Sequence, residues 1–76
     1  MTLTPREFAL LEFLMERVAE PLAKSEILAA VWGSGFDGDP NIVEVYIGYL
    51  RRKIDLKPYE SVIRTVRGVG YTVRAD

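Results

Sequence analysis

The sequence predicts an α+β fold in which three helices are followed by a C-terminal β-hairpin. Apolar residues recur at helical spacing in three segments before residue 55, and the stretch 62–74 alternates between apolar and polar side chains around a glycine-containing turn. Seventy-six residues are enough for one domain, which we expect to span 1–76. A domain of this size buries only about 60% of its unfolded surface, so its stability should be modest.

The first helix is expected to run from Thr4 to about Glu20. Thr4 can cap it, Pro5 suits the first helical position, and Glu7 can reach back to the Thr4 amide to complete a capping box. Pro21 disfavours helical backbone before it, which places the helix end near Glu20. Apolar side chains occupy more than one stripe of this helix and so predict contacts on two sides: Phe8, Leu10, Leu11, Phe13, Leu14, Met15 and Val18.

A short extended segment, which could form a strand near residues 21–23, leads into the second helix. That helix begins between Ala23 and Ser25, and Ser25 is the only good capping residue nearby. Its inward-facing side chains are Ile27, Leu28 and Val31. The stretch 33–40 is rich in glycine, aspartate and proline and therefore predicts a loop. The length of this loop makes it a candidate for function.

The third helix starts with Asp39 as the cap and Pro40 at the first position, and it should end near Asp55. Its buried stripe consists of Val43, Ile47, Leu50 and Ile54. The opposite face mixes apolar, aromatic and basic side chains, which is unusual for a solvated surface: Asn41, Ile42, Val45, Gly48, Tyr49, Arg51 and Arg52. A strand over 62–66, a turn over 67–70 and a returning strand over 71–74 follow.

Composition argues against an enzyme. The chain has no cysteine and no histidine, so disulfides, a thiolate nucleophile and the commonest general base and metal ligand are all missing. No nucleophile–base pair or cluster of metal ligands is visible, and we expect no catalytic residue, metal or cofactor. No apolar run approaches the roughly 20 residues that cross a bilayer. A cytoplasmic protein without a membrane partner is the expectation.

Charge is distributed unevenly along the chain, although the net charge is only −1. Residues 1–47 hold three basic and eight acidic residues, whereas residues 48–76 hold seven basic and three acidic ones. The C-terminal part could therefore present a basic face to a nucleic acid while the acidic part points elsewhere.

Three helices and a basic hairpin are the parts of a winged helix-turn-helix. In that fold the last helix lies in the major groove of DNA and the hairpin tip reaches a neighbouring groove or the backbone. Gly68 and Gly70 would let the hairpin turn tightly, and Arg67 beside them could enter a narrow minor groove. The alternative is a structural hairpin with solvated arginines.

Four motifs carry a resemblance to a known family. They are Leu-Thr-Pro-Arg-Glu-Phe-Ala-Leu-Leu at 3–11, Val-Trp-Gly at 31–33, Val-Glu-Val-Tyr-Ile-Gly-Tyr-Leu-Arg-Arg-Lys-Ile at 43–54 and Ile-Arg-Thr-Val-Arg-Gly-Val-Gly-Tyr at 63–71. Together they resemble the C-terminal DNA-binding effector domain of OmpR/PhoB-type response regulators. The resemblance implies sequence-specific binding of double-stranded DNA in transcriptional regulation, as the output domain of a two-component phosphorelay.

The resemblance also implies roles for individual residues. The third helix would be the recognition helix, and the residues nearest the bases would be Asn41, Ile42, Val45, Tyr49 and Arg52. Phosphate contacts would come from Arg51, Arg52 and Lys53, although one of the three could instead pair with a nearby acid. The wing would touch backbone or minor groove through Thr65, Arg67 and Tyr71.

Two further roles follow from the same resemblance. Trp32 would donate its indole N–H to a phosphate or, alternatively, close the core. The loop 33–39 corresponds to a transactivation loop, in which Phe36 and Asp37 would contact RNA polymerase.

The chain departs from the family pattern at three places. Gly48 and Tyr49 stand where arginines are frequent, which weakens guanine readout there. Ala23 stands where a serine cap is common, so Ser25 could substitute. The N-terminal sheet and the receiver domain of the family lie outside residues 1–76, so the first helix should expose an apolar stripe and the chain should self-associate. The alternative function is a winged-helix protein-interaction module that does not bind DNA, favoured by the acidic composition and the absent arginines.

Overall fold

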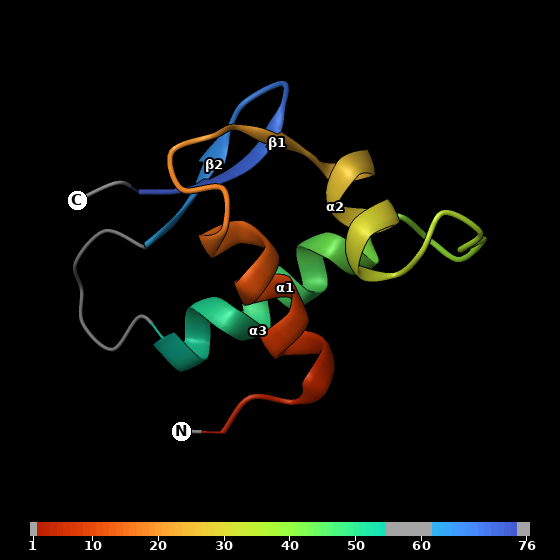
Figure 1. Ribbon diagram of the computed structural model, residues 1–76, viewed down its shortest axis with the longest axis horizontal. Helices are drawn as coiled ribbons and strands as arrows, with labels where there is room; N and C mark the ends of the chain where they lie inside the picture. Colours follow the sequence, from red (N-terminus) through yellow and green to blue (C-terminus); the bar gives the residue numbers. More distant parts are fainter. Residues whose placement is uncertain (1, 55–61, 75–76) are drawn as a thin grey trace.

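The computed structural model describes residues 2–54 and 62–74 and has the element order α1, β1, α2, α3, β2, β3 (Figure 1). The helices are α1 (Pro5–Met15), α2 (Lys24–Val31) and α3 (Ile42–Ile54), and the strands are β1 (Leu22–Ala23), β2 (Ile63–Val66) and β3 (Gly70–Val73). The predicted α+β fold, with three helices and a C-terminal hairpin, is confirmed. Among the described residues, no helix combines the length and apolarity that spanning a membrane requires.

The first helix begins as predicted but ends earlier. The Glu7 amide donates to Thr4 Oγ1 at 3.2 Å and the Thr4 amide donates to Glu7 Oε1 at 2.8 Å, which is the expected capping box. The predicted end near Glu20 is wrong, because α1 stops at Met15. Ala19 then adopts a φ of 69° and its amide donates to the Val73 carbonyl at 2.9 Å. The chain therefore leaves the helix early in order to meet the sheet.

The second helix begins within the predicted interval, but Ser25 does not cap it. Ala23 occupies the N-cap position and provides no side-chain hydrogen bond. Instead the Glu26 carboxylate accepts from the Ala23 amide at 2.8 Å. Ser25 lies inside the first turn, because pairing of β1 with the sheet fixes where the helix can start.

The third helix is capped by Asp39, whose Oδ1 accepts from the Asn41 amide at 2.9 Å. The first turn is tighter than an α-helical turn, since the Ile42 amide donates to the Asp39 carbonyl three residues back at 3.0 Å. The regular helix consequently starts at Ile42, two residues after Pro40.

The three strands form one antiparallel sheet in the order β1-β3-β2. Leu22 pairs with Tyr71 and Ala23 with Gly70, so the short strand expected near residues 21–23 is present. A Cβ atom on Gly70 would lie 2.1 Å from the Leu22 carbonyl oxygen. Glycine at position 70 is therefore required for β1 to reach the hairpin.

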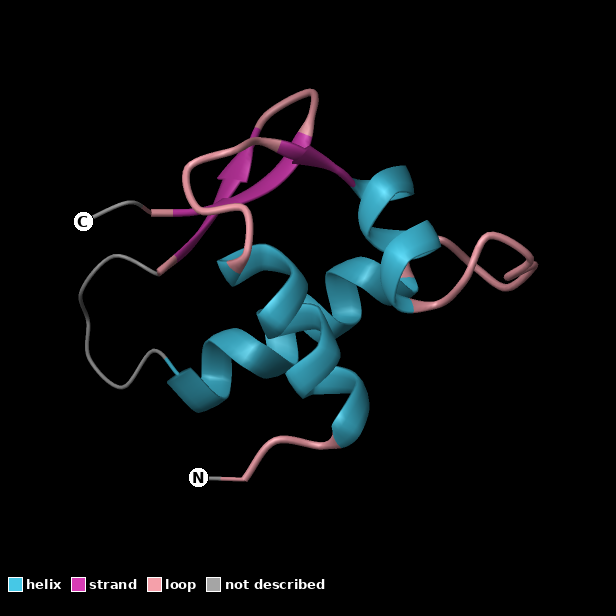
Figure 2. Cartoon of the chain, in the orientation of Figure 1, coloured by secondary structure: helices cyan, strands magenta, loops and turns pink. Residues whose placement is uncertain are grey.

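The core lies where α1, α2, α3 and the sheet meet. Figure 2 shows the strands along one side of the helices, and the loop after α2 extending away from them. The buried apolar side chains are Leu10, Leu14, Leu22, Ile27, Val43, Ile47, Leu50, Ile63, Tyr71 and Val73. The predicted buried stripe of α3 is confirmed for Val43, Ile47 and Leu50, while Ile54 is half-buried against the core.

Candidate nucleic-acid interface

The outer face of α3 carries most of the residues expected to meet DNA bases. Val45 and Tyr49 are 43% and 39% exposed, and Asn41 and Arg52 are also exposed. Ile42, which was also expected to meet the bases, is half-buried, and part of its side chain packs against the core. A Cβ atom on Gly48 would meet nothing within 4 Å, so packing within the described part of the chain does not require glycine there.

A row of three aromatic rings, each in contact with the next, connects this face of α3 to Trp32 at the end of α2. The Tyr49 ring meets the Tyr46 ring edge-on with centroids 5.2 Å apart, and Tyr46 meets Trp32 in the same way at 5.3 Å. The Arg6 guanidinium lies 5.2 Å from the centre of the Trp32 ring. Trp32 is half-buried against the core, so it holds the row in place as well as closing the core. Tyr46 was missed from the sequence, although its position one helical turn before Tyr49 gives the signal.

Arg51 is committed to the hairpin. Its Nε and Nη2 donate to the Ile63 carbonyl at 3.2 and 2.8 Å, and Nη2 also donates to Thr65 Oγ1 at 3.1 Å. The guanidinium lies 5.8 Å from the centre of the Tyr71 ring. Arg51 therefore ties α3 to β2, and this use of its donors competes with the predicted phosphate contact.

Of Arg51, Arg52 and Lys53, only Lys53 forms an ion pair among the described residues. Its Nζ lies 2.6 Å from Glu7 Oε1 and 3.0 Å from the Thr2 carbonyl oxygen. Glu7 is only 3% exposed, and hydrogen bonds from Lys53 and from the Thr4 amide hold its pKa below the ordinary value of 4.5. The pair fixes the end of α3 to the start of α1.

Arg52 remains available at the surface. It is exposed and lines a shallow hollow of about 290 Å³ together with Glu7, Tyr49 and Lys53. Within the described ranges 2–54 and 62–74 it has no ion pair. Of the three basic residues near the end of α3, Arg52 is the one that is exposed and has no ion pair among the described residues.

The wing exposes two of its three predicted contact residues. Thr65 and Arg67 are exposed, and Gly68 in the turn between β2 and β3 has a φ of 78°. Tyr71 is only 7% exposed and belongs to the core, where burial, followed by the nearby Glu44 carboxylate, raises the pKa of its phenol. Sequence alternation could not distinguish the core face of β3 from its outer face.

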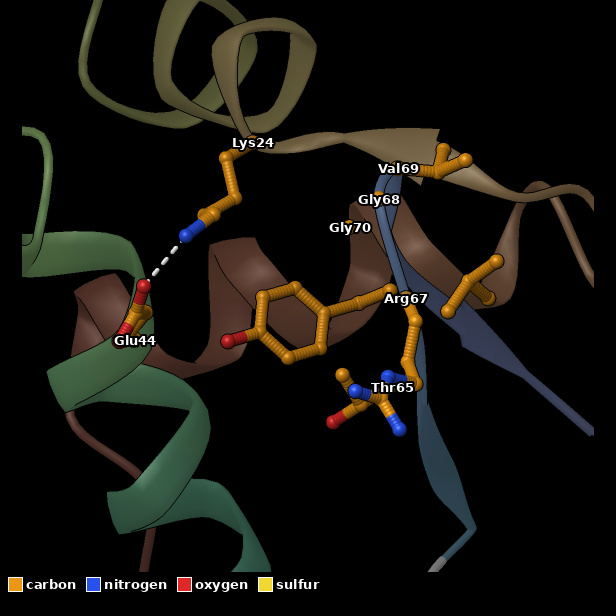
Figure 3. A pocket seen from close by; sticks show the side chains of 9 residues that line it. Lys24, Glu44, Thr65, Arg67, Gly68, Val69 and Gly70 are labelled. Atoms are coloured by element: carbon orange, nitrogen blue, oxygen red, sulfur yellow. Dashed lines mark hydrogen bonds and ion pairs between the residues drawn. The ribbon is translucent and has the colours of Figure 1, made fainter.

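A hollow of about 490 Å³ separates the wing from α3 (Figure 3). Across it, Lys24 at the start of α2 forms an ion pair with Glu44 on α3, and Thr65 and Arg67 line the wing side. The hydrogen bond to Glu44 raises the pKa of Lys24. Sequence reasoning missed this pair, because no short-range pattern joins positions 24 and 44.

The loop after α2 exposes its acidic residue and packs its aromatic residue against a glycine of the same loop. Asp37 is exposed. Phe36 is half-buried, and a Cβ atom on Gly38 would lie 2.4 Å from its Cζ atom, so the ring covers the glycine of its own loop. In the described part of the chain, the carboxylate side chains form no group that could hold a metal ion.

Comparisons with known proteins agree with this geometry. Residues 1–73 match the family described as "Transcriptional regulatory protein, C terminal". The transcriptional regulatory protein YkoG of Bacillus subtilis strain 168 is 48% identical over 73 residues, which cover 95% of this chain and 32% of that protein. The response regulator MprA of Mycobacterium leprae is 49% identical over 74 residues, covering 97% and 32%. The chain thus spans about a third of the length of these curated relatives.

Solved structures show the same fold. The DNA-binding domain of Bacillus subtilis CssR superposes with a TM-score of 0.83 at 32% identity, covering 95% of this chain and 77% of that one. The Klebsiella pneumoniae RstA DNA-binding domain, solved in complex with the RstA box, gives 0.83 at 28% identity, covering 96% and 73%. The helix-turn-helix of α2 and α3, the wing and these similarities lead to one conclusion: the chain belongs to the family of C-terminal DNA-binding domains of OmpR/PhoB-type response regulators.

Proposed function

We propose that this chain binds double-stranded DNA sequence-specifically, with α3 in the major groove and the wing on an adjacent groove or phosphate backbone. The observation that carries the proposal is the bridge made by Arg51, which holds the outer face of α3 and the wing residue Thr65 in one fixed arrangement. A rigid pair of contacting elements is what a winged helix-turn-helix needs to meet two neighbouring parts of a duplex.

The available charges support the same proposal. Arg52 on α3 and Arg67 on the wing are exposed, so both can contact phosphates, whereas Lys53 is neutralised by Glu7. Phosphate contacts supply much of the affinity of such proteins, and contacts to base edges supply the specificity. A net charge of −1 therefore does not prevent binding, provided that this local surface is basic.

The role of the whole protein is a wider proposal. The similarity to response regulators supports a non-enzymatic output domain controlled by a two-component phosphorelay, acting in the cytoplasm where DNA is bound. The exposed Asp37 in the loop after α2 suits a protein partner better than DNA, and RNA polymerase is the partner that we propose for Phe36 and Asp37. The exposed apolar side chains of α1 support self-association of the isolated chain.

A salt titration tests the DNA-binding proposal against a protein-interaction module. Affinity for a random duplex should fall steeply as salt rises, because each neutralised phosphate releases a counterion. Arg67→Ala should weaken binding by about 1–3 kcal/mol and reduce the salt dependence by about one phosphate contact, while circular dichroism shows an intact fold. Absence of binding even at low salt would favour the protein-interaction module.

A further inference from the structure

Residues 41–49, which include the first part of the outer face of α3, contain no guanidinium. Arg51 donates to Ile63 and Thr65, and the ammonium of Lys53 is held by Glu7. Arg52, which is exposed, lies two residues before the end of the helix. Bidentate donation from arginine or lysine is the commonest way to recognise guanine, and residues 41–49 have neither side chain.

The exposed side chains of residues 41–49 are instead apolar, aromatic or uncharged polar, apart from Glu44. Val45 and Tyr49 lie one turn apart and present an apolar and an aromatic surface, with Gly48 between them leaving open space. Tyr49 is supported by the Tyr46 ring, which in turn meets Trp32, so this surface is built on the core. Asn41, the residue directly before α3, is exposed and carries a carboxamide.

Glu44, the acidic residue of the same stretch, already forms an ion pair. A free carboxylate there could accept from the amino group of cytosine. The Glu44 carboxylate is instead paired with Lys24 at the start of α2, and the two side chains reach toward each other across the hollow (Figure 3). Residues 41–49 therefore have neither the arginine or lysine that most often recognises guanine nor an unpaired carboxylate for cytosine.

The remaining exposed side chains, Val45, Tyr49 and Asn41, are suited to A·T base pairs. In the major groove thymine presents its 5-methyl group, which apolar side chains contact, and adenine presents a donor and an acceptor that a carboxamide can bind together. We propose that the outer face of α3 selects A·T base pairs, with Val45 and Tyr49 on thymine methyl groups and Asn41 on adenine. This inference rests on the proposed DNA-binding function and names the class of sequence that the site takes.

Replacement of thymine by deoxyuridine tests the inference, because it removes the methyl group and leaves base pairing unchanged. Duplexes are first selected from a randomised pool with the wild-type chain, and each thymine of the selected site is then replaced in turn. At the contacted positions we expect affinity to fall about fourfold per methyl group, the loss that corresponds to one buried methylene-sized group.

Protein variants assign the effect to α3. Val45→Ser should lower affinity for the thymine site and make one of the sensitive positions insensitive to deoxyuridine, because the contact is already lost. Arg67→Ala serves as the control, since it should weaken the thymine and deoxyuridine duplexes by the same factor. Equal sensitivity to deoxyuridine in wild type and Val45→Ser would overturn the role of Val45.

The remaining outcomes separate the two proposals. A selected site that binds equally well with thymine or deoxyuridine throughout, or one whose specific positions are G·C pairs, would overturn the A·T inference while leaving DNA binding intact. Failure to enrich or bind any duplex, including at low salt, would instead contradict the proposed function itself.

Discussion

Arg51 and Arg52 are neighbours in the chain but have opposite surroundings. Arg51 is half-buried and donates to Ile63 and Thr65, whereas Arg52 is exposed beside Tyr49. The basic run could be read from the sequence as a set of phosphate contacts. Which member stays available could not, because the partners of Arg51 come 12 and 14 residues later in the chain.

This contrast predicts that a glutamine substitution will affect mainly stability at Arg51 and mainly DNA binding at Arg52. Arg51→Gln should lower the free energy of unfolding by about 1–3 kcal/mol, because it removes charge-assisted hydrogen bonds between α3 and β2. Arg52→Gln should change it by less than about 0.5 kcal/mol but reduce the salt dependence of DNA binding by about one phosphate contact. Urea denaturation and a salt titration of both variants would check this. Similar stability losses in the two variants would contradict the assignment.

Gly48 gives a second prediction at the residue scale. Nothing in the described structure occupies the space of a Cβ atom there, so Gly48→Ala should stabilise the fold by up to about 1 kcal/mol through helix propensity. If the DNA backbone or a base edge approaches this position closely, the same variant should bind DNA more weakly. Thermal melts and gel-shift assays separate the two effects. Higher stability with unchanged binding would mean that glycine is only tolerated.

At the scale of elements, local signals located the starts of helices and tertiary contacts decided the rest. The capping box of α1 and the Asp39 cap of α3 depend on residues two or three positions apart, and both were predictable. The early end of α1 was not, because it depends on the hydrogen bond from Ala19 to Val73. For the same reason only the capping role of Glu7 could be predicted, whereas the fold adds an ion pair with Lys53, 46 residues away.

The ion pair between Glu7 and Lys53 should make stability depend on pH. Because the pKa of Glu7 is held below 4.5 in the fold, its stabilising effect is present above that value and is lost as the pH falls through the folded-state pKa. Glu7→Gln keeps an acceptor for the Thr4 amide but removes the charge. Its melting temperature should therefore lie below that of wild type at about pH 7, and the difference should shrink at about pH 3.

A variant on the same helix provides the control for this measurement. Glu12 is exposed and has no ion pair among the described residues. Glu12→Gln should therefore melt like wild type at both pH values, as expected for a surface substitution. A Glu7→Gln deficit of equal size at both pH values would show that packing, rather than charge, accounts for the effect.

For the whole molecule, the fold class and the order of elements were predictable. Each helix and the hairpin carries its own periodic pattern of apolar residues, and that pattern persists over the whole element. Which residues lie on the exposed surface and which pack against the core was harder to predict. Ile42 and Tyr71 were assigned to DNA contact, yet Ile42 is half-buried and Tyr71 belongs to the core. Both lie near places where the exposed face of an element meets the core, and periodicity alone does not locate that boundary.

The exposed apolar residues of α1 predict that the isolated chain self-associates. Phe8 and Met15 lie two turns apart and are 56% and 51% exposed. Each could gain roughly 1.5–3 kcal/mol on full burial, so pairing of two copies through this stripe is favoured. Sedimentation should show an average mass that rises with concentration. Phe8→Glu should shift the chain to monomer, while Val69→Glu on the wing tip should not. A wild-type monomer at every concentration would contradict the prediction.

We expect the outer face of α3 and the wing to form one continuous DNA-binding surface. Backbone amide chemical shifts, measured by nuclear magnetic resonance while a duplex is added, test it residue by residue. We expect the changes to concentrate at residues 41–52 and 65–69 and to diminish when salt is raised, since phosphate contacts are salt-dependent. Changes confined to α1 or to the loop 33–38, with α3 and the wing unaffected, would contradict it.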